Sequence, residues 1–173
     1  TSNSSATSTL AVTGGTVSVA TDSTLVGGAV TLNGGNLTIT GASTFTNAIA
    51  LSAAATITNA NAVTLSGTIS GSNALTKAGA GTLTLSGTQA HTGTTTVSDG
   101  ALSVAADANL GTGAVTLNGG TLTVTGIGID IDNLLEMGAN HGTVGNANAV
   151  TLSGVISGSG GLTKSGAGTL TLS

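Results

Sequence analysis

The chain contains no cysteine and no proline, and it has almost no aromatic or charged residues. The absence of cysteine excludes a fold held together by disulfide bonds. Phe45 is the only aromatic residue, so the core must be built from small aliphatic side chains whose close packing brings facing backbones near each other. Charged residues make up 5% of the sequence, against roughly 25% in a typical globular protein.

Positive charge is especially scarce, because Lys77 and Lys164 are the only lysines and arginine is absent. Nucleic-acid binding depends on clustered lysine and arginine, so we expect no nucleic-acid partner. The first ten residues lack the basic and apolar segments of a signal peptide. No stretch reaches the roughly 20 apolar residues of a membrane helix. The mean hydropathy of +0.45 and the net charge of -4 also argue against intrinsic disorder.

What the chain does contain is a long internal repeat. Residues 62–86 and 149–173 agree at 21 of 25 positions, at an offset of 87. Further upstream, residues 28–41 match residues 113–126 at an offset of 85. The difference between the offsets places an insertion of two residues between Gly126 and Asn148. Repeats of this length are typical of solenoids and related arrays.

We therefore expect one β-solenoid domain over residues 1–173, made of two units of about 86 residues, at about 1–85 and 86–173. The second unit stops at Leu172-Ser173, whereas the first continues into residues 87–104. Because no capping sequence is visible at that point, we expect these residues to be a piece of a longer array.

Each unit is a series of short strand signals. Apolar residues alternate with threonine or serine, as in Thr82-Leu83-Thr84-Leu85, and this period of two indicates strands with one buried face. Glycine, asparagine, aspartate or serine interrupts each run, as at Asn33-Gly34-Gly35. An all-β fold with short strands and glycine-rich corners is the prediction.

Two all-β architectures fit these signals. In an antiparallel sandwich or barrel, the Asn-Gly-Gly turns would close hairpins. In a parallel β-helix, the same turns would form the corners of a coil. We favour the β-helix because the chain repeats at long range and lacks the buried tryptophan common in immunoglobulin-like sandwiches. With roughly 20 residues per turn it would make eight or nine turns, spaced about 4.8 Å apart.

Residues 75–87 read Leu-Thr-Lys-Ala-Gly-Ala-Gly-Thr-Leu-Thr-Leu-Ser-Gly, and this pattern resembles the passenger-associated strand repeat of bacterial autotransporters. Residues 75–104 cover the whole repeat, residues 161–173 cover its first half, and residues 9–19 resemble a degenerate second half. The chain departs from the pattern at Gln89-Ala90-His91, where the family favours Asn-Thr-Tyr, and at Thr94, where it favours glycine.

The resemblance implies an elongated, right-handed parallel β-helix at the bacterial cell surface or secreted. It also implies a non-catalytic structural or adhesive role as a stalk or fibre. Attachment to the outer membrane would then occur only through a barrel domain outside these residues. The partners we expect are neighbouring repeats of the same protein, further copies of it, and host or surface glycans. Because lysine-rich protection of strand edges is missing, we expect end-to-end association.

The acidic residues gather where the two units differ most, between residues 126 and 148. Asp130 and Asp132 would share one face of an extended strand, with Glu136 and His141 further along. Paired carboxylates suit Ca²⁺, which takes oxygen ligands. However, the glycine-rich calcium repeat is absent and two carboxylates seldom suffice. We therefore predict a solvated, mutationally tolerant turn at residues 127–147 and no metal site.

The two histidines offer no catalytic arrangement in the sequence. His91 and His141 lie far apart, and no GxSxG motif accompanies them. Activation of a nucleophile needs a positioned base. We therefore predict no catalytic residues, no cofactor and no enzymatic activity. A polysaccharide-acting β-helix is the least favoured alternative, because clustered acids and sugar-stacking aromatics are missing.

Lys77 and Lys164 occupy equivalent positions in the two units. One interpretation is a contact with an anionic glycan. The interpretation we favour is a solvated side chain on a turn, with its methylene groups covering an apolar edge.

Threonine pairs such as Thr82/Thr84 and Thr121/Thr123 would project outward from the strands. Flat threonine arrays resemble the ice-facing surfaces of solenoid ice-binding proteins, which makes ice binding an alternative function. Threonine is also a good strand former on a solvated face. Ice binding requires threonine columns in register, and the pattern recurs about every 86 residues. We therefore expect these residues to serve the strands.

Overall fold

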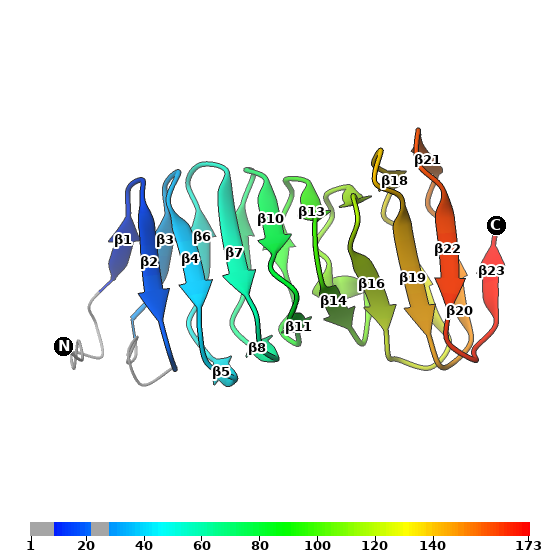
Figure 1. The fold of residues 1–173 in the computed structure, drawn as a ribbon, viewed down its shortest axis with the longest axis horizontal. Helices are drawn as coiled ribbons and strands as arrows, with labels where there is room; N and C mark the ends of the chain where they lie inside the picture. Colours follow the sequence, from blue (N-terminus) through cyan, green and yellow to red (C-terminus); the bar gives the residue numbers. More distant parts are fainter. Residues whose placement is uncertain (1–8, 22–27) are drawn as a thin grey trace.

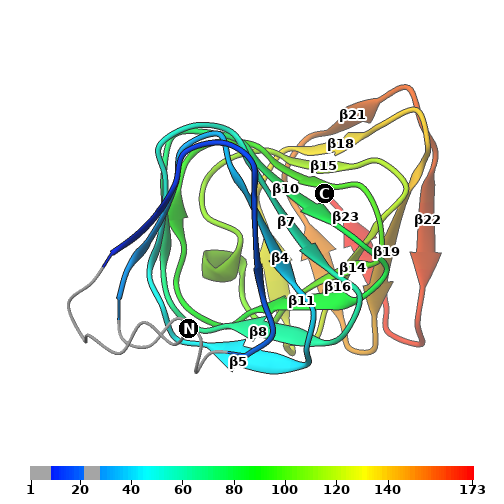
Figure 2. The same cartoon turned by 60° about the vertical axis from the view of Figure 1, so that its left-hand side comes forward.

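The chain forms an elongated coil of short β-strands in a computed structural model, which describes residues 9–21 and 28–173 (Figure 1). Strand β1 (Leu10–Val12) and strand β23 (Leu170–Leu172) lie at opposite ends of the long axis. In Figure 1 the front strands run downward and the back strands run upward while the chain advances from left to right. The coil is therefore right-handed. Figure 2 shows the turns stacked behind one another around a common interior.

The strands form four parallel sheets, which we name A to D. Sheet A contains β1, β3 (Val30–Leu32), β6 (Ile49–Leu51), β9 (Ile69–Gly71) and β12 (Ala90–His91). Sheet B contains β2 (Thr16–Val19), β4 (Asn36–Ile39), β7 (Ala55–Asn59), β10 (Leu75–Ala78), β13 (Thr95–Val97), β15 (Val115–Leu117), β18 (Leu135–Met137) and β21 (Ile156–Gly158). Sheet C contains β5 (Ser43–Phe45), β8 (Val63–Leu65), β11 (Thr82–Leu85), β14 (Ala101–Val104), β16 (Thr121–Val124), β19 (Gly142–Asn146) and β22 (Leu162–Ser165). Sheet D contains β17 (Ile129–Ile131), β20 (Val150–Leu152) and β23.

From β3 to β14, each turn of the coil visits sheets A, B and C in that order. Between β14 and β15 the short 3₁₀ helix η2 (Asp107–Asn109) takes the place of a strand, and sheet D then replaces sheet A. Strands in adjacent turns are offset by 20 residues at Leu10↔Val30, 19 at Val30↔Ile49 and 22 at Thr121↔Thr143. The predicted all-β parallel solenoid, with about 8 turns, is confirmed.

The core follows from the alternation of the sequence. In β11, Leu83 and Leu85 are buried and the two threonines between and before them are not. Leu102 and Leu122 stack on Leu83 in the next two turns, and all three are fully buried. Each turn therefore buries aliphatic side chains against those of its two neighbours, which is how a solenoid without aromatic residues stabilises itself.

The two sequence units do not occupy the same faces of the coil. Val30–Leu32 lies in sheet A, whereas its counterpart Val115–Leu117 lies in sheet B. Val63–Leu65 lies in sheet C, whereas its counterpart Val150–Leu152 lies in sheet D. From β3 to η2 the first unit contains twelve strands and one 3₁₀ helix that takes the place of a strand, which makes thirteen strand positions. Four turns of three strands fill twelve of these positions, so one position is left over. Each unit is consequently advanced by one face relative to the unit before it.

The two-residue insertion divides between two corners. The corner before β17 has four residues, 125–128, where the first unit has three, 40–42. The corner before β19 also has four, 138–141, where the first unit has three, 52–54. The prediction of a solvated, tolerant turn at 127–147 is wrong for most of this segment. It forms β17, β18 and β19, and it buries Ile131, Leu135 and Val144.

Among the described residues, the structure contains no helix that is long and apolar enough to cross a membrane.

Candidate functional surface

The outer face of sheet C is the most regular surface of the coil. Every outward position in its seven strands is threonine, serine, alanine or glycine. These residues form two columns along the coil. One column contains Thr82, Ala101, Thr121, Thr143 and Thr163. The other contains Thr44, Thr64, Thr84, Ser103, Thr123, Gly145 and Ser165.

Sheet B carries a third column. Thr56, Thr76, Thr96 and Thr116 lie next to one another in four consecutive turns. Glu136 continues the column, and the Thr116 hydroxyl donates a hydrogen bond of 3.3 Å to its carboxylate. The expectation that threonine recurs only about once per unit is therefore wrong. The turns are nearly constant in length, so hydroxyls recur from turn to turn, spaced about 4.8 Å apart.

Two of the predicted acidic residues, Asp130 and Asp132, lie on the outside of the coil near Asp107 of η2. Asp132 donates its backbone N–H to the Asp107 carboxylate at 3.3 Å, and Asp130 is exposed on the same strand side. Burial raises the pKa of the Asp107 carboxyl, the hydrogen bond from Asp132 opposes this, and the negative charges of Asp132 and Asp130 add to the rise. The described residues contain no group of three or more histidine, cysteine or acidic side chains arranged to hold a metal ion.

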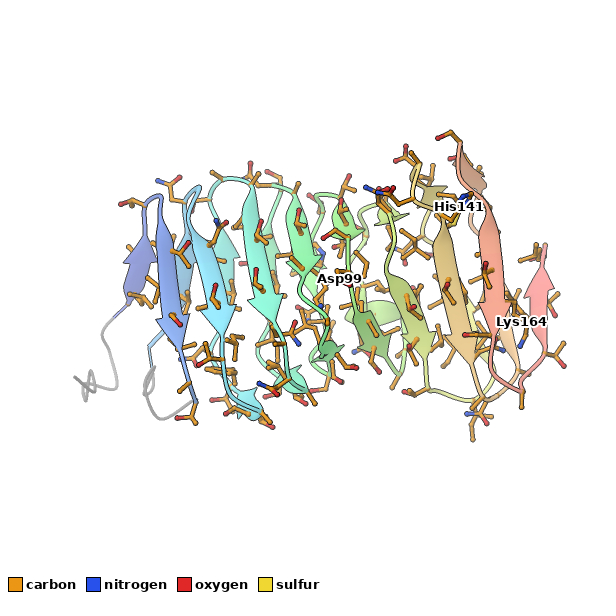
Figure 3. All side chains as sticks on the ribbon, in the orientation of Figure 1. Asp99, His141 and Lys164 are labelled. Carbon is orange, nitrogen blue, oxygen red and sulfur yellow. The ribbon has the colours of Figure 1, made fainter. Side chains whose placement is uncertain are left out.

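The two histidines lie in different parts of the coil. His91 is fully buried on β12, and its Nε2 lies 2.8 Å from the Thr95 hydroxyl, while its buried Nδ1 has no partner. Burial lowers the pKa of His91. His141 is exposed in the corner before β19, with a positive φ of 61°, and its Nδ1 accepts the backbone N–H of Gly161 (Figure 3). The structure does not bring the two histidines together.

Lys77 is the least expected feature of the interior. Its side chain points inward from β10 and has 0% exposure. The ammonium donates hydrogen bonds to the carbonyl oxygens of Ala78 at 2.9 Å, Gly79 at 2.6 Å and Asp99 at 3.1 Å. Ala78 is the last residue of β10, Gly79 begins the corner after it, and Asp99 belongs to the corner of the next turn. Burial lowers the pKa of Lys77 from 10.5 to about 8, and attraction to the Asp99 carboxylate partly opposes this shift.

The prediction of a solvated lysine on a turn is therefore wrong for Lys77, and so is the alternative of a glycan contact there. The sequence held the signal that was missed, because Lys77 has the same parity as the buried Leu75. Lys164 is placed equivalently on β22 but is exposed (Figure 3). Its ammonium bonds to the carbonyls of Ser165 at 3.2 Å and Gly166 at 2.6 Å.

A family model described as the passenger-associated-transport-repeat matches residues 75–104 and 162–173. The first match runs from β10 to β14, and the second covers β22 and β23. The match confirms the resemblance to the passenger repeat that the sequence shows in these segments. The comparison with curated proteins found no match, and the comparison with solved structures found none.

Proposed function

We propose that this chain is a non-catalytic structural module of a bacterial autotransporter-type passenger, which forms part of a stalk or fibre displayed at the cell surface or secreted. The observation that carries the proposal is the match to the passenger repeat at two places, residues 75–104 and 162–173, within one coil of parallel sheets. Such a coil gains length without changing its cross-section, because each turn contacts only its neighbours. About 8 turns extend the chain on the order of 40 Å along the axis.

The composition supports a passive role for the outer surface. The outward positions of sheet C offer hydroxyl and methyl groups and no charge. Threonine and serine hydroxyls can both donate and accept hydrogen bonds, so a neutral glycan is a suitable adhesive partner. Lys77 takes no part in adhesion, because its ammonium is enclosed in the core.

The test of display is to place the chain, with an epitope tag, in the passenger position of a surface-displayed autotransporter. We expect antibody to label the tag on intact cells and external protease to remove it. Retention of the tag inside cells that are otherwise competent for display would contradict the proposal. A matched variant, Leu102→Asp, places a charge in the core without changing the outer surface. It should be displayed in an unfolded, protease-sensitive form.

The adhesive part of the proposal needs a separate measurement. Cells displaying the chain are compared on immobilised neutral glycans with cells displaying a variant in which Thr84 and Thr123 are both replaced by lysine. We expect the replacement to reduce adhesion, because two long cations would interrupt one hydroxyl column. Equal adhesion of the two strains, or none by either, would restrict the function to that of a structural spacer.

Ice binding is a second candidate, and the registered columns are the observation that favours it. Two adjacent columns of small hydroxyl-bearing residues run along sheet C, from β11 to β22. A regular array of this kind can hold water molecules in a repeating pattern. The test is thermal hysteresis of the purified chain, with the same Thr84 and Thr123 double variant as control. Hysteresis no greater than that of the variant would remove this candidate.

A further inference from the structure

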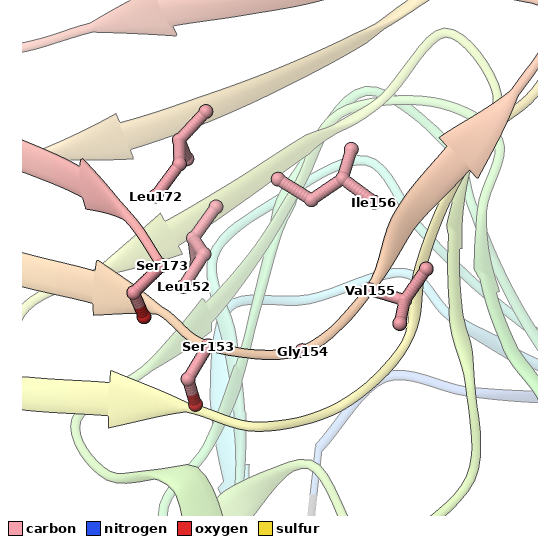
Figure 4. Close-up of a pocket in the computed structure, with 7 residues that line it drawn as sticks. All are labelled: Leu152, Ser153, Gly154, Val155, Ile156, Leu172 and Ser173. Carbon is pink, nitrogen blue, oxygen red and sulfur yellow. The ribbon is translucent and has the colours of Figure 1, made fainter.

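The corners of the coil contain reactive groups that the proposed function does not use. The hollow shown in Figure 4 offers none, because it is lined by aliphatic side chains, among them Leu152, Ile156 and Leu172, and by serine and glycine. Two corners, in contrast, contain an asparagine followed by glycine, at Asn33-Gly34 and Asn118-Gly119. This pair occurs nowhere else in the sequence.

An asparagine followed by glycine can be modified without an enzyme. The glycine backbone nitrogen loses its proton to a base in the solvent and attacks the carbon of the asparagine side-chain amide. A carbon–nitrogen bond forms, ammonia leaves with a proton from the solvent, and a succinimide ring results. Water then opens the ring at either carbonyl, which gives aspartate or isoaspartate. Glycine favours ring closure because it has no Cβ atom to obstruct the approach of the backbone.

The two Asn-Gly corners have the same local sequence and the same type of backbone conformation. Residues 28–35 and 113–120 both read Gly-Ala-Val-Thr-Leu-Asn-Gly-Gly. The glycine that follows the asparagine has a positive φ in both corners, 76° at Gly34 and 102° at Gly119. Any difference in reactivity between the two corners must therefore come from the turns stacked on them.

The corner stacked on Asn118 holds both groups that would have to react. The Gly119 N–H donates a hydrogen bond of 2.7 Å to the carbonyl oxygen of His141, so the attacking nitrogen is engaged. The Asn118 Oδ1 accepts the backbone N–H of Asn140 at 3.1 Å, which fixes the side chain. A Cβ atom built on Gly138 would lie 2.7 Å from the Asn118 Cγ, so the backbone of this corner packs on the amide carbon. Ring closure at Asn118 requires these contacts to break first.

Asn33 and Gly34 lack this cover among the described residues. Both are exposed, and no described heavy atom outside the adjoining residues lies within 4 Å of the place that a Cβ atom of Gly34 would take. In the part of the chain that the structure describes, the Gly34 N–H donates no hydrogen bond. The N–H groups of Ser52 and Ala53, in the stacked corner, both donate to the carbonyl of Leu32 instead. The attacking nitrogen and the amide carbon are therefore free to meet.

The length of the stacked corner explains the difference. The corner 138–141 has four residues, whereas the corner 52–54 has three. The longer corner places a backbone N–H and a carbonyl on the second Asn-Gly pair. We propose that Asn33 is a site of spontaneous deamidation in the folded coil and that the corner 138–141 protects Asn118. The first unit then gains a carboxylate in this corner, while its counterpart in the second unit stays neutral.

Mass spectrometry of the whole chain, incubated in the folded state at mildly alkaline pH, measures both sites. Trypsin cleaves only after Lys77 and Lys164, so digestion of the unfolded chain separates residues 1–77 from residues 78–164. Each of these fragments contains one Asn-Gly pair, and deamidation raises its mass because an amide becomes a carboxyl group. We expect the first fragment to gain this mass at least about tenfold faster than the second, because hydrogen bonds must break at Asn118.

Three controls separate the effect of structure from that of sequence. In denaturant, the two fragments should gain mass at similar rates, since their Asn-Gly segments are identical. Asn33→Gln should remove the gain of the first fragment from the folded chain. Replacing residues 138–141 by Ser-Ala-Ala, the sequence of residues 52–54, should raise the rate at Asn118 toward that at Asn33. Circular dichroism would show that the strands are retained in each variant.

Several results would overturn the proposal. Equal rates in the folded chain, or a faster rate at Asn118, would show that the stacked corner does not control the reaction. Conversion of both sites in denaturant and of neither in the folded chain would show that the coil protects both corners. A gain of mass that persists in Asn33→Gln would place the reaction at another residue. An unchanged rate at Asn118 in the folded replacement variant would exclude the corner 138–141 as the source of protection.

Discussion

At the scale of the residue, polar side chains inside this coil bind the backbone of its corners. The Lys77 ammonium contacts carbonyls in two successive turns. The amide of Asn59 likewise donates to the carbonyls of Asn61 and Thr82, and Asn146 repeats this with Asn148 and Thr169. Buried polar groups are stable only when their hydrogen bonds are made. Corners that expose carbonyls to the interior therefore explain why a lysine is found in an aliphatic core.

Replacing Lys77 by methionine tests this explanation. Methionine fills a similar volume but leaves the three carbonyls without their donor, so we expect the free energy of unfolding to fall by about 1–3 kcal/mol. The same replacement at Lys164 should change it by less than about 0.5 kcal/mol, because that side chain is exposed. Denaturant unfolding of the two variants gives the comparison. Equal stabilities for the two would mean that the buried ammonium contributes nothing.

We expect His91 to lower the free energy of unfolding of the coil as the pH falls. Burial lowers its pKa in the folded state below the ordinary value of 6.5. Well above pH 6.5 the ring is neutral in both states, so its contribution is constant. As the pH falls below 6.5 the unfolded chain takes up a proton that the folded chain resists, and the folded state loses stability. Unfolding at pH 7.5 and pH 5, with His91→Phe as the reference, isolates this effect.

The expected outcome is a larger loss of stability on acidification in the original chain than in His91→Phe. His141→Ala serves as the control, since that ring is exposed and should leave the loss unchanged. The same loss in the original chain and in His91→Phe would show that the buried ring does not control the acid response.

At the scale of the element, a strand together with the corner that follows it can occupy different sheets of this coil. Identical sequences occupy sheet A or sheet B, and sheet C or sheet D, in the two units. The corners stack closely: a Cβ atom added at Gly113 would lie 2.0 Å from the carbonyl oxygen of Gly93 in the turn before. Some corners therefore require glycine because a side chain would collide with the backbone of the neighbouring turn. Other corners require it because their φ is positive.

Two glycine substitutions separate these requirements. Gly34 has a φ of +76° and open space around it, so Gly34→Ala should cost only local strain, about 1 kcal/mol. Gly113→Ala meets the backbone of the stacked corner, so two turns must separate and the cost should be about 2–4 kcal/mol. Thermal unfolding of the two proteins checks the order. A greater loss in Gly34→Ala would show that corner stacking is looser than the structure indicates.

At the scale of the whole molecule, the unit of about thirteen strand positions does not contain a whole number of turns. Successive units therefore present the same residues on successive faces, and a third unit would be advanced by one face again. A side chain that recurs once per unit would therefore appear on successive faces and follow a spiral around the coil. This arrangement is possible because all three faces accept the same strand length and the same alternation.

Removal of one unit should leave a shorter, folded coil. In a chain without residues 28–112, Thr116 takes the place of Thr31 and becomes the neighbour of Ala11. Cysteines at positions 11 and 116 should then form a disulfide bond within the chain. The same pair in the undeleted chain should not do so, because position 116 lies in sheet B several turns away. Loss of strand signal in the shortened chain would contradict the interchangeability of faces.

Several properties of this protein follow from the sequence by itself. The period of two in runs such as 82–85 determines the strands, because it separates a buried from a solvated face. The long repeat determines the solenoid, and the motif at 75–104 identifies the passenger repeat. The parity of Lys77 with Leu75 also indicates that its side chain points inward from β10.

Only the tertiary structure decides how the turns lie on one another. The length of a turn depends on the geometry of three corners, and no local pattern marks where one turn ends. The sequence therefore predicts threonines spaced by the repeat of about 86 residues, whereas the structure aligns threonines in every turn of sheet B from β7 to β15. The same stacking decides that Lys77 is enclosed, because the third carbonyl of its site comes from the next turn.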